Sequence, residues 1–200
     1  MKRLLVLASG RGSNLKAILE ATHTGTLRAK VIGAGVSKVC EALQVIEGNG
    51  LKAMIAPSEA EILQFVLNEK IDAVVLAGYM KVISPSLIEA LRDEKGLSRI
   101  LNIHPSLLPS FPGLDAYQQA FNAGVRESGI TVHLVEKEID SGPILDQKSF
   151  RIDQLKSPEE VQARGLQVEH ALYPQTIDWF VHGEYRAEKR EGAIYVARLH

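Results

Sequence analysis

Asn102, His104 and Asp140 are the three side chains whose types and spacing suit acyl-group chemistry. Asn102 and His104 are one residue apart at the end of the apolar run 100–103, in the segment ILNIHPSLLPSFPG. Residues so spaced in a strand point to the same face. An amide there can donate a hydrogen bond to a developing oxyanion, while an imidazole can move protons near neutral pH. A histidine before a proline-rich loop is also commonly a plain hydrogen-bonded residue, so both interpretations stay open.

Asp140 lies in the short link KEIDSGP between two expected strands. A carboxylate there can orient an imidazole and stabilise its charged form. Asp-Ser-Gly is also ordinary turn sequence, which is an equally simple explanation for the segment alone. His133, in the middle of the preceding strand, is predicted to be a packed, hydrogen-bonded residue.

A glycine-containing turn, ASGRGSNLKAIL, follows the first apolar run. Gly12, Ser13 and Asn14 would present backbone N–H groups and polar side chains at the positive end of a helix, where a phosphate binds well. The turn lacks the third glycine of the dinucleotide fingerprint and the Gly-Lys-Ser/Thr of a Walker loop. A well-capped helix start without a ligand is the alternative.

The segment LAGYMKVIS follows another apolar run. Ligands of open α/β sheets bind beyond the carboxyl ends of the strands. Tyr79, Met80, Val82 and Ile83 therefore either wall a pocket for a flat apolar ligand or cap the core.

Short apolar runs alternate with segments of helical period in the first hundred residues. The expected strands are 4–8, 30–36, 53–56, 73–77 and 100–103, and the expected helices are 12–21, 39–50, 58–69 and 85–91. Ser58 with Glu61 predicts a capping box. Near-continuous apolar strands between helices indicate a doubly wound α/β fold with a mostly parallel sheet.

The second half of the chain has a different pattern. A helix ending near Gly124 precedes two strands, 129–136 and 143–152, whose short link predicts an antiparallel pair. Ser157 should cap a long helix that Pro174 kinks or splits, and residues 184–200 are expected to form a small hairpin.

Composition narrows the class of protein. The 23 basic and 24 acidic residues give a net charge of −1, which argues against nucleic acid or a membrane surface as the main partner. The single cysteine, Cys40, excludes an internal disulfide framework, and no His or Cys cluster has metal-ligand spacing. The opening apolar run is too short for a signal peptide. We expect a cytoplasmic protein that uses no metal.

Five segments in order resemble the folate-dependent formyltransferases, in particular the phosphoribosylglycinamide (glycinamide ribonucleotide) formyltransferase branch. They are SGRGSNLKAIL, LAGYMKVIS, NIHPSLLPSFPGLDAYQQAF, GITVHLVEKEIDSGPIL and VEHALYP. The pattern N-I-H-P-S-L-L-P followed by D-x-G-P-I is specific for folate-dependent formyl transfer. The S-G-x-G-S-N opening is specific for the ribonucleotide branch.

The resemblance implies a role for each matching residue. It makes Asn102, His104 and Asp140 the catalytic trio that passes a formyl group from 10-formyltetrahydrofolate to the amine of glycinamide ribonucleotide in purine biosynthesis. The ribonucleotide would contact Gly12, Ser13, Asn14, Gly78 and Glu169. The folate side would be lined by Gly78, Met80, Lys81, Val82 and Ile83, with the loop from Glu136 to Asp140 closing over the pterin.

The resemblance also implies the organisation of the chain. Residues 1–200 would be one formyltransferase domain, with a nucleotide- and phosphate-binding half (1–100) and a catalytic, folate-binding half (101–200). Its partners would be these two small molecules, with neither nucleic acid nor membrane, and the protein would be a monomer or a homodimer.

The chain departs from the family pattern at several positions. Leu166 replaces a polar residue that usually reaches the phosphate, and Gln167 is one step, about 100°, further round the helix. Lys81 stands where arginine is common, so the charge is kept without the planar fork. The segment GAGVSKVCEALQ is atypical, and LRDEKGLSRI is longer than usual.

Three other functions are consistent with parts of the pattern. A formyltetrahydrofolate deformylase shares the trio but uses water as acceptor, and usually has an extra N-terminal regulatory domain. A methionyl-tRNA formyltransferase shares SLLP and the late aspartate, but needs a basic C-terminal domain. A non-catalytic folate or nucleotide binder would have no need of all three catalytic residues.

Overall fold

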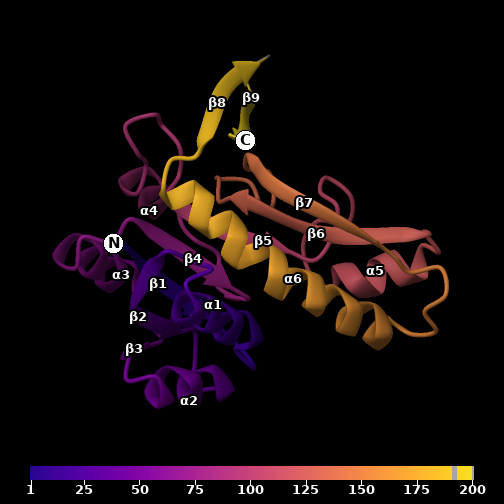
Figure 1. Ribbon diagram of the computed structural model, residues 1–200, viewed down its shortest axis with the longest axis horizontal. Helices are drawn as coiled ribbons and strands as arrows, with labels where there is room; N and C mark the ends of the chain where they lie inside the picture. The colour runs from indigo at the N-terminus through magenta and orange to yellow at the C-terminus, as the bar shows by residue number, and fades with distance from the viewer. Residues whose placement is uncertain (191–192, 200) are drawn as a thin grey trace.

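A seven-stranded sheet forms the centre of the protein in a computed structural model that describes residues 1–190 and 193–199 (Figure 1). Its strand order is β3-β2-β1-β4-β5-β6-β7. The strands are β1 (Lys2–Ala8), β2 (Ala29–Val36), β3 (Lys52–Ile55), β4 (Ala73–Ala77), β5 (Ile100–His104), β6 (Glu127–Leu134) and β7 (Ile144–Arg151). Strands β1 to β5 are parallel, while β6 pairs antiparallel with β5 and β7 antiparallel with β6.

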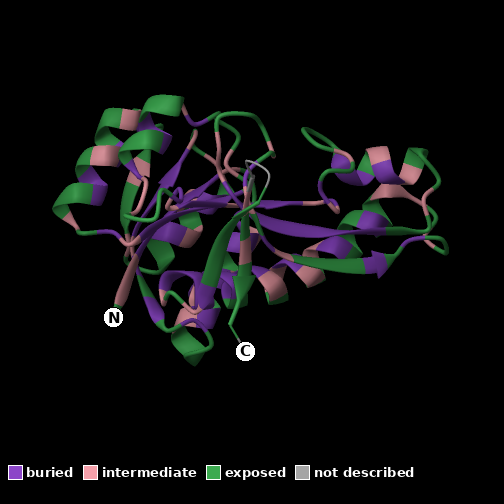
Figure 2. Cartoon of the chain, turned by 90° about the horizontal axis from the view of Figure 1, so that it is seen from above, coloured by how far each residue is buried: buried purple, intermediate pink, exposed green. Residues whose placement is uncertain are grey.

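Six helices accompany the sheet in the described part of the chain. They are α1 (Ser13–Thr24), α2 (Glu41–Gly48), α3 (Glu59–Asn68), α4 (Pro85–Ala90), α5 (Ala116–Asn122) and α6 (Pro158–Val181). One hydrophobic cluster joins the sheet to α1, α2 and α6, and a second joins it to α3 and α4. Strand β1 shows the division: Leu4 and Val6 belong to the first cluster and Leu5 and Leu7 to the second. The central strands are therefore buried on both faces, as Figure 2 shows.

The doubly wound α/β fold and the single domain expected from the sequence are confirmed. Every strand and helix expected in the first hundred residues is present, with ends shifted by a few residues. The capping box is present: Ser58 Oγ accepts from the Glu61 amide, and the Glu61 carboxylate accepts from the Ser58 amide at 2.8 Å. The antiparallel pair β6–β7 is also as predicted.

Pro174 was expected to kink or split the last helix, and the helix is not split. α6 runs unbroken from Pro158 to Val181 with Pro174 inside it (Figure 1). The neighbouring Tyr173 is fully buried, and its hydroxyl donates to the carbonyl groups of Leu76 at 2.9 Å and Leu101 at 3.0 Å. These contacts hold the helix against β4 and β5 next to the missing amide, which offsets the cost of the lost backbone hydrogen bond.

The expected C-terminal hairpin is present as β8 (Tyr185–Arg190) and β9 (Ala193–Arg198), which pair antiparallel outside the main sheet (Figure 1). Residues 191, 192 and 200 of that expectation lie outside the described residues. Tyr185 stacks on Phe180 with ring centroids 5.2 Å apart, which attaches the start of the hairpin to the end of α6.

Candidate active site

The three residues singled out for acyl chemistry lie together at one end of the sheet. Asn102 and His104 are on β5, and the register pairs Leu76 of β4 with Asn102, so both lie at the carboxyl edge of the parallel strands. Asp140 comes from the loop after β6, and its Oδ2 is 3.2 Å from His104 Nδ1. The side chains of His104 and Asp140 are only 5% and 9% exposed. The interaction is therefore shielded from water, where a charge pair is stronger than at the surface.

Both ring nitrogens of His104 face hydrogen-bond acceptors. Nδ1 faces the Asp140 carboxylate, and Nε2 is 2.9 Å from the carbonyl oxygen of Phe111. A carbonyl and an ionised carboxylate accept hydrogen bonds and donate none, whereas a neutral imidazole has one N–H. An N–H on Nε2 donates to the Phe111 carbonyl, and the Asp140 carboxylate lies close to Nδ1. The two partners fix the orientation of the imidazole ring.

Asp140 is held in place by its own backbone and by the proline-rich loop. It has a left-handed conformation, with φ of 54°, and its Oδ2 accepts a 2.8 Å hydrogen bond from the amide of Gly113. Burial works to raise the pKa of the Asp140 carboxyl. The contacts with His133, Gly113 and His104 together outweigh burial and hold that pKa below its usual value. The carboxylate is thus ionised at neutral pH.

His133 is a fourth member of the site. It is packed and hydrogen-bonded, as expected, but it lies directly across the antiparallel pair from Asn102. Its Nδ1 donates to the Leu134 carbonyl at 2.9 Å, and its Nε2 is 3.3 Å from Asn102 Nδ2 and 3.6 Å from Asp140 Oδ1. The 3.6 Å separation is too long for a hydrogen bond. Nε2 thus lies between the Asn102 amide and the Asp140 carboxylate, and its contact with the amide helps to orient Asn102.

Hydrogen bonds to β6 and β7, in addition to prolines, hold the loop after His104. Thr131 Oγ1 donates to the Ser106 carbonyl at 2.7 Å and accepts from the Leu108 amide at 3.1 Å. Gln147 Nε2 lies 2.8 Å from the same hydroxyl and 3.0 Å from the Leu108 carbonyl. This loop supplies the Phe111 carbonyl and the Gly113 amide, so a fixed loop means a fixed His104 and Asp140.

The glycine turn meets α6 at the same edge of the sheet. Gly12 has φ of 71°, which favours glycine, and a Cβ there would be 2.9 Å from the Cβ of Ala42. Asn14 is buried at the start of α1, and its Nδ2 donates to Glu169 Oε2 at 2.5 Å. Ser13 begins the helix, which has no side-chain N-cap hydrogen bond. The structure thus brings Gly12, Ser13, Asn14 and Glu169 together.

The residues expected on the folate side fall into two groups. Gly78 follows β4 with φ of 71°, and Met80, Lys81 and Val82 are exposed beyond it, with Met80 at 66% and Val82 at 75%. Ile83 is 7% exposed and packs in the α3–α4 cluster. Leu114 and Ile139, beside the Gly113–Asp140 hydrogen bond, are also exposed apolar residues, at 71% and 66%. Exposed apolar side chains thus flank the polar trio.

Glu136, at the start of the Asp140 loop, pairs with the long segment after α4. Its two carboxylate oxygens accept from Arg92 Nη1 at 2.8 Å and Nη2 at 2.7 Å. Arg92 also donates to Glu89 at 2.9 Å and to the Gly96 carbonyl at 2.8 Å. The pair attaches the loop to the 92–98 segment. A folate contact from Glu136 stays a prediction.

Leu166 is half-buried on α6, and Gln167 lies on the exposed side of the same helix. Gln167 Oε1 accepts from Arg164 at 3.1 Å. Gln167 therefore does not replace the polar side chain expected at position 166.

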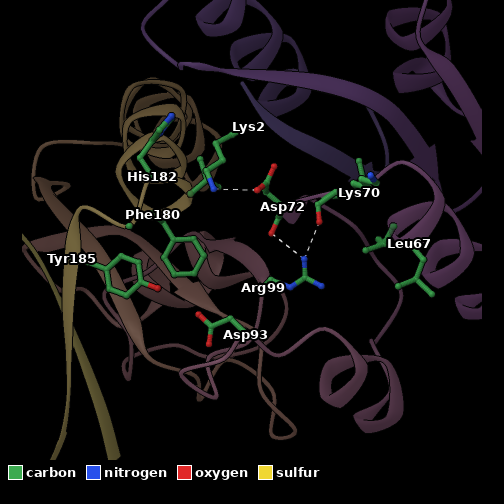
Figure 3. Close-up of a pocket in the computed structure, with 13 residues that line it drawn as sticks. Lys2, Leu67, Lys70, Asp72, Asp93, Arg99, Phe180, His182 and Tyr185 are labelled. Carbon is green, nitrogen blue, oxygen red and sulfur yellow. Dashed lines mark hydrogen bonds and ion pairs between the residues drawn. The ribbon is translucent and has the colours of Figure 1, made fainter.

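A cavity of about 510 Å³ lies at the opposite edge of the sheet (Figure 3). Lys2, Asp72 and Arg99 stand at the amino ends of β1, β4 and β5 and line it. Lys2 Nζ is 3.1 Å from Asp72 Oδ1, and Arg99 Nη1 donates to the Ile71 carbonyl at 2.8 Å. Lys2, Asp72 and Arg99 thus bond to one another or to the backbone.

Two kinds of feature are absent from the described ranges. No three or more His, Cys, Asp or Glu side chains there are grouped so that they could hold a metal ion. Among the helices of residues 1–190 and 193–199, none is long and apolar enough to cross a membrane.

A doubly wound sheet with an amide, an imidazole and a carboxylate at its carboxyl edge defines an α/β enzyme suited to carbonyl-group transfer. The family model for formyl transferase matches residues 2–177. The phosphoribosylglycinamide formyltransferase of Bacillus subtilis is 38% identical over 200 residues, covering 94% of this chain and 100% of that protein. The chain therefore belongs to the formyl transferase family, among the phosphoribosylglycinamide formyltransferases.

Two solved structures extend the comparison. Glycinamide ribonucleotide transformylase 1 from Symbiobacterium toebii has a TM-score of 0.90 at 34% identity, covering 100% of this chain and 95% of that one. A formyltetrahydrofolate deformylase from Pseudomonas syringae has a TM-score of 0.86 at 25% identity, covering all of this chain but 66% of its own. The fold is thus common to a transferase and a hydrolase.

Proposed function

We propose that the protein transfers the formyl group of 10-formyltetrahydrofolate to the primary amine of glycinamide ribonucleotide, a one-carbon step of purine biosynthesis. The observation that carries this proposal is His104, held between the Phe111 carbonyl and the Asp140 carboxylate on the same strand face as Asn102. The Bacillus subtilis relative bears the name of this activity and is similar along its whole length.

The ribonucleotide would bind at the α1–α6 side of the carboxyl edge. Its phosphate would accept from the free amides of Gly12 and Ser13 at the positive end of α1. Its ribose hydroxyls would donate to Glu169, since a carboxylate has about four acceptor positions and only two are used. Asn14 would contact the same part of the ligand, and Gly78 would lie beside it.

The folate would bind on the other side of the trio. Met80 and Val82 supply apolar surface for a flat ring, and Lys81 supplies positive charge near the acidic tail of a folate. Ile83 would contribute through its backbone, because its side chain belongs to the core. The loop from Glu136 to Asp140 would close over the pterin.

The reaction follows from the charges at the trio. The amine attacks the formyl carbon, and the carbonyl electron pair moves to oxygen. Asn102 donates to this oxyanion, and the imidazolium of His104 stabilises the same negative charge. Asp140 holds His104 in place, and its carboxylate accepts the proton lost by the attacking nitrogen and then releases it. The leaving folate nitrogen gains a proton as the carbon–nitrogen bond breaks, so no acyl-enzyme and no metal are needed.

Folate release measured by absorbance, with and without glycinamide ribonucleotide, tests this function. We expect turnover of the formyl folate only when the ribonucleotide is present. Equal turnover without it would make water the acceptor, which is the reaction of the deformylase with the similar fold. An absence of turnover both with and without the ribonucleotide would overturn the proposal.

A further inference from the structure

Tyr117 is a buried tyrosine that neither the sequence motifs nor the trio accounts for. It lies on α5, is 8% exposed, and its hydroxyl donates to Glu169 Oε1 at 2.6 Å. Burial, together with the charge and the hydrogen bond of Glu169, raises the pKa of the Tyr117 phenol far above its usual value. The phenol is therefore always protonated, and it donates a hydrogen bond to the carboxylate at any pH the enzyme meets.

Helix α6 is shaped to receive this ring. Gly165 is one helical turn before Glu169, and a Cβ there would lie 2.1 Å from Tyr117 Oη and 2.4 Å from two ring carbons. Any larger residue at 165 would therefore displace the phenol. Glycine in the middle of a helix is unfavourable compared with alanine, so its presence here requires a reason, and the close approach of Tyr117 supplies one.

The two oxygens of Glu169 are bound by residues from different helices. Oε1 accepts from Tyr117 on α5, and Oε2 accepts from Asn14 on α1. Glu169 is only 6% exposed, and a buried carboxylate is stable only when its oxygens are hydrogen-bonded. The tyrosine thus fixes the rotation of the carboxylate about its last bond, which decides where the unused acceptor positions point.

We propose that Tyr117 is a positioning residue for the ribonucleotide: by holding Oε1 of Glu169, it aims the remaining acceptor positions of the carboxylate at the ribose hydroxyls. This inference rests on the proposed function. It gives Tyr117 a role in binding the ribonucleotide and none in binding the folate. The catalytic trio lies on β5 and the loop after β6, and none of its hydrogen bonds involves Tyr117.

Steady-state kinetics of Tyr117→Phe test the inference, because phenylalanine keeps the ring and removes only the donor. We expect the KM for glycinamide ribonucleotide to rise roughly tenfold, the usual effect of losing a hydrogen bond to a charged group. The KM for 10-formyltetrahydrofolate and kcat should stay within about twofold of wild type. Tyr195→Phe, which removes an exposed hydroxyl on β9, is the matched control and should leave all three constants unchanged.

A double-mutant cycle with Glu169→Gln separates positioning from packing. In the Glu169→Gln background the tyrosine substitution should add little, because the two residues act as one unit.

Gly165→Ala is an independent variant. If Tyr117 acts as proposed, alanine at 165 pushes the phenol from Glu169 and raises the same KM, although the substitution favours the helix. Provided that the wild type is active, an unchanged KM for the ribonucleotide in Tyr117→Phe would overturn the inference. Equal increases of the KM values for both substrates would overturn it as well. Absence of ribonucleotide-dependent turnover by the wild type would instead refute the proposed function, and the inference with it.

Discussion

The two edges of the seven-stranded sheet have similar kinds of polar side chain but use them differently. At the amino edge, Lys2 pairs with Asp72, and Arg99 donates to the Ile71 carbonyl (Figure 3). At the carboxyl edge, His104 faces two acceptors, and the Asn102 amide has a second N–H left for a ligand. At the amino edge these side chains bond to other groups of the protein, whereas at the carboxyl edge the Asn102 amide can still donate a hydrogen bond to a ligand.

The difference shows that the volume of a cavity is a poor guide to function. The cavity at the amino edge measures about 510 Å³, but its Lys2, Asp72 and Arg99 side chains already have partners within the protein. At the carboxyl edge a buried carboxylate holds an imidazole beside an amide that has an unused N–H. A favourable site for a transition state needs donors that are fixed before the reaction and unused before the ligand arrives.

Asn102→Ala should have the largest effect on activity. Removing a donor to the oxyanion typically costs about 10²–10³ in kcat. Because Asn102 is bonded only to His133 in the described structure, the unfolding temperature should change little. Kinetics and thermal unfolding of the same preparation measure both quantities. Activity within about twofold of wild type would remove Asn102 from the mechanism.

Asp140→Asn should reduce kcat by roughly 10²-fold, since His104 would lose the partner that holds it in place. Asp146→Asn is the matched control, because it removes the same charge from β7, and its kcat should equal that of wild type. A kcat for Asp140→Asn equal to that of the control would contradict the role of the carboxylate.

The same variant gives a prediction for stability against pH. The folded-state pKa of Asp140 lies below its unfolded value, so its charge stabilises the fold above the unfolded pKa, near 3.9, and this contribution is lost as the pH falls through the folded pKa. The free energy of unfolding of wild type minus Asp140→Asn should decrease as the pH falls below about 4. Urea unfolding across this range measures it. An increase of this difference in unfolding free energy at low pH would contradict a lowered pKa of Asp140 in the folded state.

Arg92→Met should have a smaller effect, confined to the folate. The bidentate pair with Glu136 holds the start of the loop that carries Asp140, and both side chains are 21% exposed, so the pair is worth about 1 kcal/mol. We expect the KM for 10-formyltetrahydrofolate to rise about two- to fivefold. Arg92→Lys, which keeps the charge but loses the fork, should give an intermediate value. Equal KM values in wild type, Arg92→Met and Arg92→Lys would show that the Arg92–Glu136 pair does not affect folate binding.

Arg99→Met should affect stability without changing activity. The substitution removes a donor from the Ile71 carbonyl at the amino edge, which costs about 1–2 kcal/mol of unfolding free energy. Both KM values and kcat should equal those of wild type. A change in any kinetic constant would show that the amino edge of the sheet influences the site at the carboxyl edge, and would contradict this comparison.

Most of the fold follows from local patterns in the sequence. Each apolar run of the first hundred residues became a strand, because strands covered on both faces need apolar residues at nearly every position. Ser58 and Glu61 predicted the start of α3 because the capping box is satisfied within one turn. Pro174 misled because the contacts of Tyr173 with β4 and β5 are distant in sequence and override the local cost.

The site was predictable in part for the same reason. Asn102 and His104 share a face by spacing alone, and Asp140 became a candidate through its motif. His133 was missed as a member because its place opposite Asn102 depends on the register of β5 and β6, which no local pattern determines. Tyr117 was missed because only the packing of α5 on α6 brings it to Glu169.

The destination of the formyl group tests the central claim most directly. With 10-formyltetrahydrofolate labelled in its formyl carbon and glycinamide ribonucleotide present, the label should appear on the ribonucleotide amine, one for each folate released. Label recovered as formate at the same rate, with or without the ribonucleotide, would contradict the account and make the carboxyl edge the site of a hydrolase.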